Sequence, residues 1–182
     1  MVIDVGLVAS AKRGDKKAFE KLYTQIYKDL YRYAFYMLKN SQEAEDIVSD
    51  TICDVYRYIS SLKQDESFFS WTIKILSTKC KMKRKEYINA VEQYDESAEN
   101  IISNSLTNSH EFASSALTRC DLINVLNCLC DEDKEIIILS AVFCYNSKEI
   151  GEIINMNPNT VRSRLNRALE KVKERMIAYE NK

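Results

Sequence analysis

Glycine and proline are almost missing from this 182-residue chain, which has three glycines and one proline. Sheet proteins need many turns, and turns depend on these two residues, so their scarcity argues against a β-rich fold. Hydrophobic residues make up 46% of the chain and charged residues 29%, which is typical of a globular protein and not of a disordered one. The composition therefore predicts an all-α fold.

Long apolar runs and a secretion signal are missing as well. The longest apolar stretch, Ile136 to Tyr145, is about half of the ~20 residues that a helix needs to cross a bilayer, so we interpret it as a buried core helix. Asp4 stands where a signal peptide would be basic. We therefore expect a cytoplasmic protein.

Side chains that serve catalysis or metal binding are scarce. His110 is the only histidine, and the six cysteines include no C-x-x-C pair, so a convergent set of zinc ligands is missing. The chain has no Gly-rich phosphate loop and no nucleophile elbow. We predict reduced thiols that mostly pack as small hydrophobic side chains. We also predict that the protein is not an enzyme and takes no cofactor, metal or small-molecule substrate.

Net positive charge is missing too, although the charges are unevenly placed. The net charge is −1, which is unusual for a protein that holds DNA alone, because phosphate neutralisation supplies most non-specific affinity. Residues 79–85 carry five basic side chains, whereas Glu86 to Glu111 contains six acidic residues and no lysine or arginine. Residues 162–175 are basic again. An acidic segment thus separates two basic ones.

Apolar residues at three- and four-residue spacing predict helices through residues 8–87. A break at 39–42 offers Asn40 or Ser41 as the N-cap of the next helix. Residues 88–116 are acidic, rich in serine and asparagine and only weakly periodic, which is typical of a flexible linker. Helical periodicity returns within 117–180. The predicted helices there are 121–130, 132–144, 147–154 and 158–178. We therefore predict two small helical domains joined by a linker.

The last two predicted helices carry the signals of a helix-turn-helix. Asn146 and Glu149 have the spacing of a capping box, and Asn157 precedes Pro158 at the start of the final helix. Gly151 lowers helix stability, which predicts a close helix crossing at that position. Asn155 can adopt the left-handed conformation that ends a helix.

The final helix has two distinct faces. The predicted buried stripe is Val161, Leu165, Ala168, Leu169 and Val172. The predicted exposed face consists of Ser163, Asn166 and Arg167, with Thr160 and Arg162 on its flanks. Arginine can pair with guanine, asparagine can pair with adenine, and both reach phosphates. The pattern favours a DNA-reading face, with an ordinary solvated helix surface as the alternative.

Two motifs resemble those of a known family. The segment YNSKEIGEIINMNPNTVRSRLNRALEKVKE resembles the promoter −35-reading part of bacterial sigma factors, whose pattern is Y-S-x-x-E-I-A followed by T-V-K/R-S-R-L-x-R-A. Upstream, GDKKAFEKLYTQIYKDLYRYAFYMLKNSQEAEDIVSDT and FFSWTIKILSTKCKMKRK resemble sigma region 2. Both motifs in this order, with a short linker and no other regions, are similar to the extracytoplasmic-function group of sigma factors. The resemblance covers nearly the whole chain.

The resemblance implies a sigma factor that binds core RNA polymerase, directs it to promoters and helps to open the −10 DNA in a stress or envelope response. The implied contacts with the polymerase β′ clamp helices are Glu45, Asp46, Ser49 and Asp50. The implied −10 contacts are Tyr58, Leu62, Thr78, Lys79, Lys81 and Met82. The implied −35 contacts are the exposed residues of the final helix: Thr160, Arg162, Ser163, Asn166 and Arg167. An anti-sigma factor is an implied partner.

Thr78 is the main departure from the family pattern, because the family has an asparagine there that helps to hold a −10 base. Ser49 stands where the family usually has glutamine. Two other functions are compatible with the residues. One is an autonomous helix-turn-helix transcriptional regulator, and the other is a sigma-like adaptor that binds proteins only.

Overall fold

The computed structural model describes residues 3–93, 126 and 129–180, and every regular element in these residues is a helix. The chain divides into two compact units, Met1–Asn108 and Ser109–Lys182. The predicted all-α fold with two helical domains is therefore confirmed. The predicted helix 121–130 lies mostly outside the described residues. So does the predicted linker 88–116, apart from its first residues.

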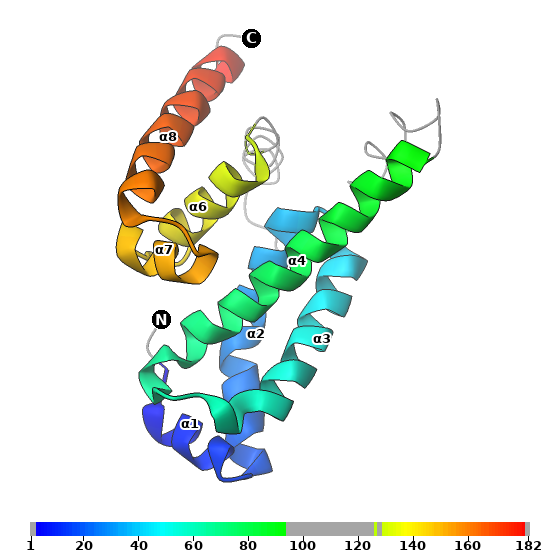
Figure 1. Ribbon diagram of the computed structural model, residues 1–182, viewed down its shortest axis with the longest axis vertical. Coiled ribbons are helices and arrows are strands. Elements are labelled where there is room, and N and C mark those ends of the chain that lie inside the picture. The colour runs from blue at the N-terminus through cyan, green and yellow to red at the C-terminus, as the bar shows by residue number, and fades with distance from the viewer. Residues whose placement is uncertain (1–2, 94–125, 127–128, 181–182) are drawn as a thin grey trace. The chain divides into compact units, whose positions relative to one another are not determined.

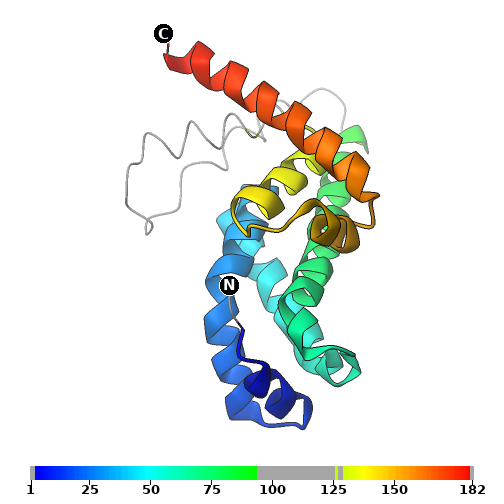
Figure 2. The ribbon, with the colours of Figure 1, turned by 90° about the vertical axis from the view of Figure 1, so that its left-hand side faces the viewer.

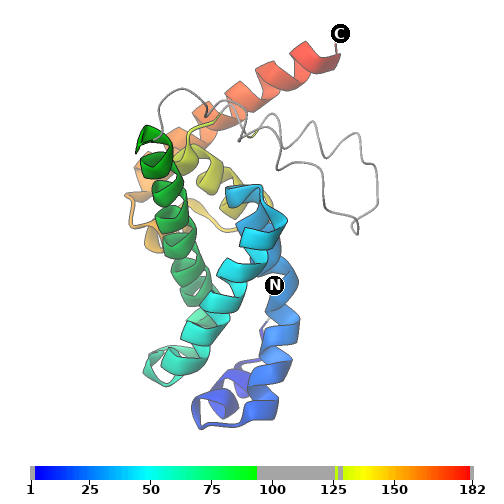
Figure 3. The same ribbon diagram turned by 90° about the vertical axis from the view of Figure 1, so that its right-hand side faces the viewer.

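The first unit is a helical bundle. Its elements are α1 (Val5–Lys12), α2 (Lys16–Leu38), α3 (Ser41–Tyr58), the short 3₁₀ helices η1 (Ile59–Ser61) and η2 (Asp65–Ser67), and α4 (Phe68–Gln93). Helices α2, α3 and α4 pack side by side, and α1 contacts α2 near the end where α2 begins (Figures 1 and 3). Residues 88–93, which we had placed in the linker, form the end of α4.

The core of this unit follows the predicted helical periodicity. On α2 the residues Leu22, Ile26 and Leu30 are at most 1% exposed, one turn apart on a single face. On α3 the matching face carries Val48 and Val55, both fully buried. Asn40, predicted as a possible N-cap, accepts a hydrogen bond at its side-chain oxygen from Glu43 N at 3.2 Å. Burial of these apolar faces holds the three long helices together.

The second unit contains α6 (Asp131–Ala141), α7 (Ser147–Ile154) and α8 (Pro158–Glu180), coloured yellow to red in Figure 2. Ile136, Leu139 and Ile150 are fully buried, as are Val161 and Ala168 of α8. Leu165 and Val172 are half-buried. Leu169, which we had placed in the buried stripe, is 47% exposed, because it lies about 100° around the helix from Ala168.

The turn between α7 and α8 has the predicted caps. The capping box of Asn146 and Glu149 is formed in both directions. Asn155 ends α7 in the left-handed conformation at φ 57°, and the side-chain oxygen of Asn157 accepts a hydrogen bond from Asn159 N at 2.9 Å. These caps fix where α7 stops and where α8 starts.

Gly151 lies against this turn and not at the helix crossing that we predicted. Its carbonyl oxygen accepts a hydrogen bond from Met156 N at 2.9 Å, which draws the turn onto α7. A methyl group at Gly151 would overlap the backbone carbonyl of Met156 and approach Pro158 to 3.6 Å. A glycine is therefore required here because the turn backbone passes so close to α7.

The described cysteines are free thiols, and the predicted packing is correct for Cys80 alone among them. Cys53, Cys130 and Cys144 are exposed. Cys53 is two residues from the buried Thr51, and thus on the opposite side of α3, while the other two lie outside helices. Among the described residues no cluster of three potential metal ligands occurs.

Across the described helices, none combines the length and the apolar character that spanning a membrane requires.

We expect Gly151→Ala to lower the free energy of unfolding of the second unit by about 1–3 kcal/mol, the usual range for overpacking a close contact. Thermal unfolding followed by circular dichroism would measure this change. Gly6→Ala is the control, because the atom nearest to the added methyl is a side-chain oxygen of Asp4 at 3.1 Å and not a backbone atom. If Gly151→Ala were as stable as Gly6→Ala, the close approach of the turn would not limit this position.

Candidate nucleic-acid and protein interfaces

The first turns of α8 present a polar face. Thr160, Arg162 and Ser163 are exposed, as are Asn166 and Arg167. Val161 and Ala168, both fully buried, hold the opposite side of the helix against the core of the second unit. All five predicted −35 residues are therefore accessible together on one helix surface.

Two of these side chains are partly ordered by their own helix. The Ser163 hydroxyl donates to the Thr160 carbonyl at 3.0 Å, and Arg167 Nε donates to the Ser163 carbonyl at 3.3 Å. The second bond uses the Nε–H of Arg167 and not its terminal NH groups. Arginine has five N–H donors in a planar fork, so this side chain retains the donors that a base edge or a phosphate would need.

A third arginine of this segment, Arg164, does not share the exposed face. Its Nε donates to Asp133 Oδ1 at 2.7 Å, and its NH1 forms a short ion pair with Glu132. The hydrogen bond that Arg164 donates to Asp133 is the main reason why the pKa of Arg164 is raised above its ordinary value. We had assigned Arg164 no role, although its spacing from Val161 and Ala168, three and four residues, places it on the buried side of α8.

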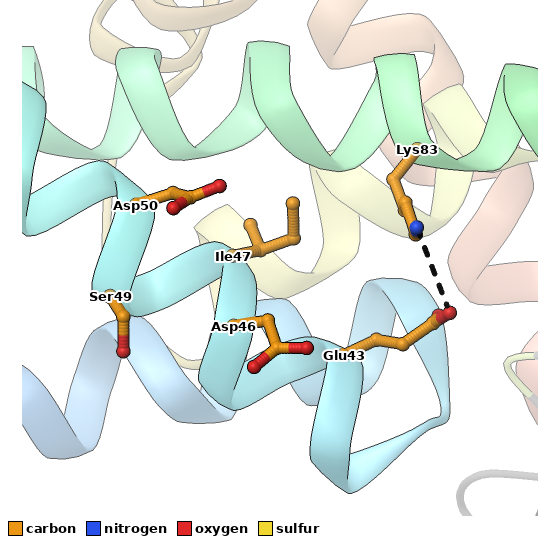
Figure 4. A pocket seen from close by; sticks show the side chains of 6 residues that line it. All are labelled: Glu43, Asp46, Ile47, Ser49, Asp50 and Lys83. Carbon is orange, nitrogen blue, oxygen red and sulfur yellow. Dashed lines mark ion pairs between the residues drawn. The ribbon is translucent and has the colours of Figure 1, made fainter.

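The exposed carboxylates of α3 line a groove. Asp46, Ser49 and Asp50 project around it from α3, together with Glu43 and Ile47, while Lys83 reaches in from α4 (Figure 4). The groove has a volume of about 420 Å³. Three of the four predicted polymerase-binding residues are thus brought together, and the fourth, Glu45, is exposed beside them.

Glu43 is the most constrained acid of this groove. Lys83 Nζ lies 4.0 Å from one of its carboxylate oxygens, while the other oxygen is buried and has no hydrogen-bond partner among the described residues. Burial raises the pKa of Glu43, and the negative charge of Asp46 adds to this effect, whereas Lys83 offsets it only in part. The groove is therefore acidic and poorly compensated, which favours a basic partner.

Helix α2 carries an aromatic stripe beside this acidic face that our sequence analysis did not single out. Tyr23, Tyr27, Tyr31 and Phe35 follow one another at four-residue spacing, with ring centroids 5.4, 6.3 and 6.1 Å apart. Burial, and then the charge of Glu45, raises the pKa of both Tyr27 and Tyr31. The four-residue spacing of these aromatic residues was the available signal in the sequence.

The predicted −10 residues come from the end of α3 and the middle of α4. Tyr58 is 51% and Met82 61% exposed, and Thr78 and Lys81 are exposed as well. Leu62 differs from the others: it is only 7% exposed, because it closes η1 and packs into the core. Its side chain is therefore not presented to a base in this structure.

Polar groups in the −10 region are partly committed to protein partners. The Thr78 hydroxyl donates to the Lys74 carbonyl at 2.9 Å. Lys79 Nζ lies 2.8 Å from Asp54 Oδ2, and Arg57 NH1 lies 3.4 Å from the other oxygen of the same carboxylate. The hydrogen bond from Lys79 is the main reason why the pKa of Asp54 is lowered. Asp54 thus joins α3 to α4 and partly neutralises two basic side chains.

Comparison with known protein families places these three surfaces in two recognised regions. Residues 22–86, which include the α3 groove and the α4 surface, match the model of sigma-70 region 2. Residues 121–172, which include the exposed face of α8, match the model of sigma-70 region 4.

Individual proteins match over most of the chain. SigV, an RNA polymerase sigma factor of Bacillus subtilis, is 30% identical over 160 residues, which cover 87% of this chain and 91% of SigV. SigW, an ECF RNA polymerase sigma factor of the same organism, is 26% identical over 178 residues, which cover 93% of this chain and 94% of SigW. The solved structure of the sigma factor RpoE from Bartonella quintana, in complex with the anti-sigma factor NepR, has the same fold. Its TM-score is 0.72 at 21% identity, covering 88% of this chain and 97% of that one.

The matches to regions 2 and 4 and the identity to SigV over nearly the full length of both chains confirm the family that the sequence motifs indicated. The chain belongs to the extracytoplasmic-function family of RNA polymerase sigma factors, and it is thus a transcription-initiation factor and not an enzyme.

Proposed function

We propose that this sigma factor reads the −35 element of its promoters with the exposed face of α8. The observation that carries the proposal is that Thr160, Arg162, Ser163, Asn166 and Arg167 are all exposed on the side of α8 that faces away from its buried residues. The arginines and the asparagine are suited to base edges, and the hydroxyl side chains are suited to phosphates.

The surface formed by Tyr58 and the exposed part of α4 is the proposed −10 site. An exposed aromatic ring, the apolar Met82 and the basic Lys81 offer stacking, a pocket wall and backbone neutralisation to unpaired bases. Lys79 joins this set when a phosphate replaces Asp54 as its partner. Leu62 has an indirect role in the proposal, since it supports η1 beneath Tyr58 from within the core.

The acidic groove of α3 is the proposed binding site for the β′ clamp helices of core polymerase. Glu45, Asp46, Ser49 and Asp50 are exposed, and an uncompensated acidic surface favours association with a basic one. The chain's net charge of −1 supports a division of labour, in which polymerase supplies much of the DNA affinity.

The proposal also includes the bounds of the two regions, the cellular location of the protein and its regulation. Region 2 runs from residue 8 to the end of α4 at Gln93, region 4 spans 117–180, and the residues between them link the two. The protein works in the cytoplasm, in a stress or envelope response, and an anti-sigma factor masks it before induction. The complex of Bartonella RpoE with NepR supports the last point, because that protein has the same fold.

Run-off transcription tests the function as a whole. We expect discrete transcripts from promoter templates when the protein is added to core polymerase. We expect only weak binding of promoter duplex by the protein alone at physiological salt, because its net charge is −1. A nanomolar, sequence-specific complex without polymerase would identify an autonomous regulator. Polymerase binding without transcripts would identify an adaptor.

We expect Arg162→Ala and Arg167→Ala each to weaken promoter binding by the holoenzyme by about 1–3 kcal/mol, because each removes a base or phosphate contact. Affinity for core polymerase should stay unchanged, since the clamp-binding groove lies in region 2. Arg175→Ala is the control: it removes the same charge from an exposed position further along α8. Unchanged promoter binding by both variants would place −35 recognition elsewhere.

We expect Asp46→Lys and Asp50→Lys to weaken assembly with core polymerase by about tenfold or more, because a like charge then faces the basic partner. Fluorescence titration of labelled protein with core polymerase would measure this. Glu20→Lys makes the same charge change at an exposed position of α2 outside the groove and should bind normally. If all three variants assembled alike, the groove would not be the polymerase site.

A further inference from the structure

Arg164 lies within the segment that reads the −35 element in the proposed function, yet its side chain points away from the exposed face. It follows Val161 by three residues and precedes Ala168 by four, and both are fully buried. Arg162 and Arg167, by contrast, are exposed. The Arg164 side chain is 24% exposed and extends along the buried side of α8 to the start of α6.

Every nitrogen of the Arg164 guanidinium has a partner on α6 or its N-cap residue. Nε donates to Asp133 Oδ1 at 2.7 Å, NH1 contacts the Glu132 carboxylate, and NH2 lies 3.6 Å from the Cys130 sulfur. Cys130 is the N-cap of α6, and the two acids belong to its first turn. The planar guanidinium group of Arg164 therefore contacts three residues at the start of α6. These contacts restrain both the separation and the relative rotation of α6 and α8.

The Asp133 side of this contact is largely covered by protein but not fully buried. Its side chain is 13% exposed. Burial by itself would raise the pKa of Asp133, but hydrogen bonds from the Cys130 thiol and from Arg164 outweigh burial and lower it. Asp133 is thus a partly buried carboxylate whose charge is favoured by these donors, and removing Arg164 leaves that charge without the cation that contacts it.

We propose that Arg164 is a positioning residue for −35 recognition: by holding the first turn of α6, it sets the rotation of α8 and so aims the face that contains Arg162, Ser163, Asn166 and Arg167 at the DNA. The proposal rests on the proposed function of that face. Arg164 itself makes no DNA contact. A lysine cannot replace it fully, because a single ammonium group cannot engage Asp133 and Glu132 in a fork.

The test uses the holoenzyme, formed from core polymerase and the full chain. A promoter is first obtained by transcribing a randomised DNA library with the wild-type holoenzyme and sequencing the templates that yield transcripts. The readout is the ratio of transcription from this promoter to transcription from a copy with a scrambled −35 element. A loss of holoenzyme assembly or of −10 function changes both transcripts and leaves this ratio unchanged.

We expect Arg164→Ala to lower this ratio by about tenfold, as is typical when one member of a coupled network is removed. Arg164→Lys should give an intermediate ratio. Arg175→Ala, which removes one positive charge from the same helix outside the network, should leave the ratio within about twofold of the wild type.

The direction in which Asp133→Asn changes this ratio distinguishes a positioning role of Arg164 from a DNA contact. If Arg164 positions the helix, breaking its ion pair lowers the ratio, and combining Asp133→Asn with Arg164→Ala causes no further fall. If Arg164 were instead a DNA contact that Asp133 restrains, Asp133→Asn would release it and raise the ratio. Because asparagine keeps the size and one acceptor of the aspartate, this variant still tests the proposal if Arg164→Ala does not fold.

The outcomes separate this inference from the proposed function. If Arg162→Ala and Arg167→Ala lower the ratio while Arg164→Ala and Asp133→Asn do not, Arg164 is not a positioning residue and the proposed reading face stands. An unchanged or raised ratio for Asp133→Asn alone also overturns the inference. If Arg162→Ala and Arg167→Ala leave the ratio unchanged, both the reading face and its positioning by Arg164 are wrong.

Discussion

The backbone hydrogen bond from Met156 to the carbonyl of Gly151 is the constraint on which the C-terminal unit depends. It closes a turn so tight that no side chain fits at Gly151, and it requires a left-handed residue at Asn155. This turn sets the direction in which α8 leaves α7, and Val161 is turned into the core. The direction of α8 then determines which residues are left in water, and these are the polar residues proposed to contact DNA.

Electrostatic compensation explains how a nearly neutral protein can keep particular charges available. Lys79 is paired with Asp54, and Arg164 with Asp133, whereas Arg162 and Arg167 extend from the exposed face of α8. The ion pair of Arg164 with Asp133, whose side chain is only 13% exposed, is not readily exchanged for a phosphate, because breaking it leaves a largely covered acid uncompensated. Half-exposed Lys79 can make that exchange at smaller cost. The distribution of ion pairs thus separates basic side chains that stabilise the fold from those that remain available to bind DNA.

Much of the fold could be predicted from the sequence because it follows from local rules. The periodic face of α2, the Asn40 cap, the capping box at Asn146 and the left-handed Asn155 depend on residues within a turn or two. What could not be predicted depends on neighbours distant in sequence. The partner of Gly151 was assumed to be a helix and is the backbone of a turn. Leu169 fits the apolar spacing, but it is 47% exposed because the core of this unit does not extend around the helix to it. The partners of Arg164 lie more than thirty residues earlier, so its spacing indicated the buried side but not what it binds there.

In the candidate site, too, the sequence indicates which residues belong to the surface but not which partners their side chains have. These partners affect how the −10 surface would recognise DNA. The family resemblance assigns Thr78 to the −10 site, but it does not show that its hydroxyl proton is directed to the Lys74 carbonyl. Where the family has an asparagine with two amide donors and a carbonyl acceptor, this chain offers a hydroxyl with its donor already occupied. Leu62 is buried, and Lys79 is held by Asp54. The accessible groups are then Tyr58, Lys81 and Met82, which can stack, neutralise and pack but cannot read a base edge by paired hydrogen bonds. On the proposed function, capture of the unpaired strand would therefore depend on stacking and charge at this surface, and the finer sequence discrimination would depend on the arginines of α8.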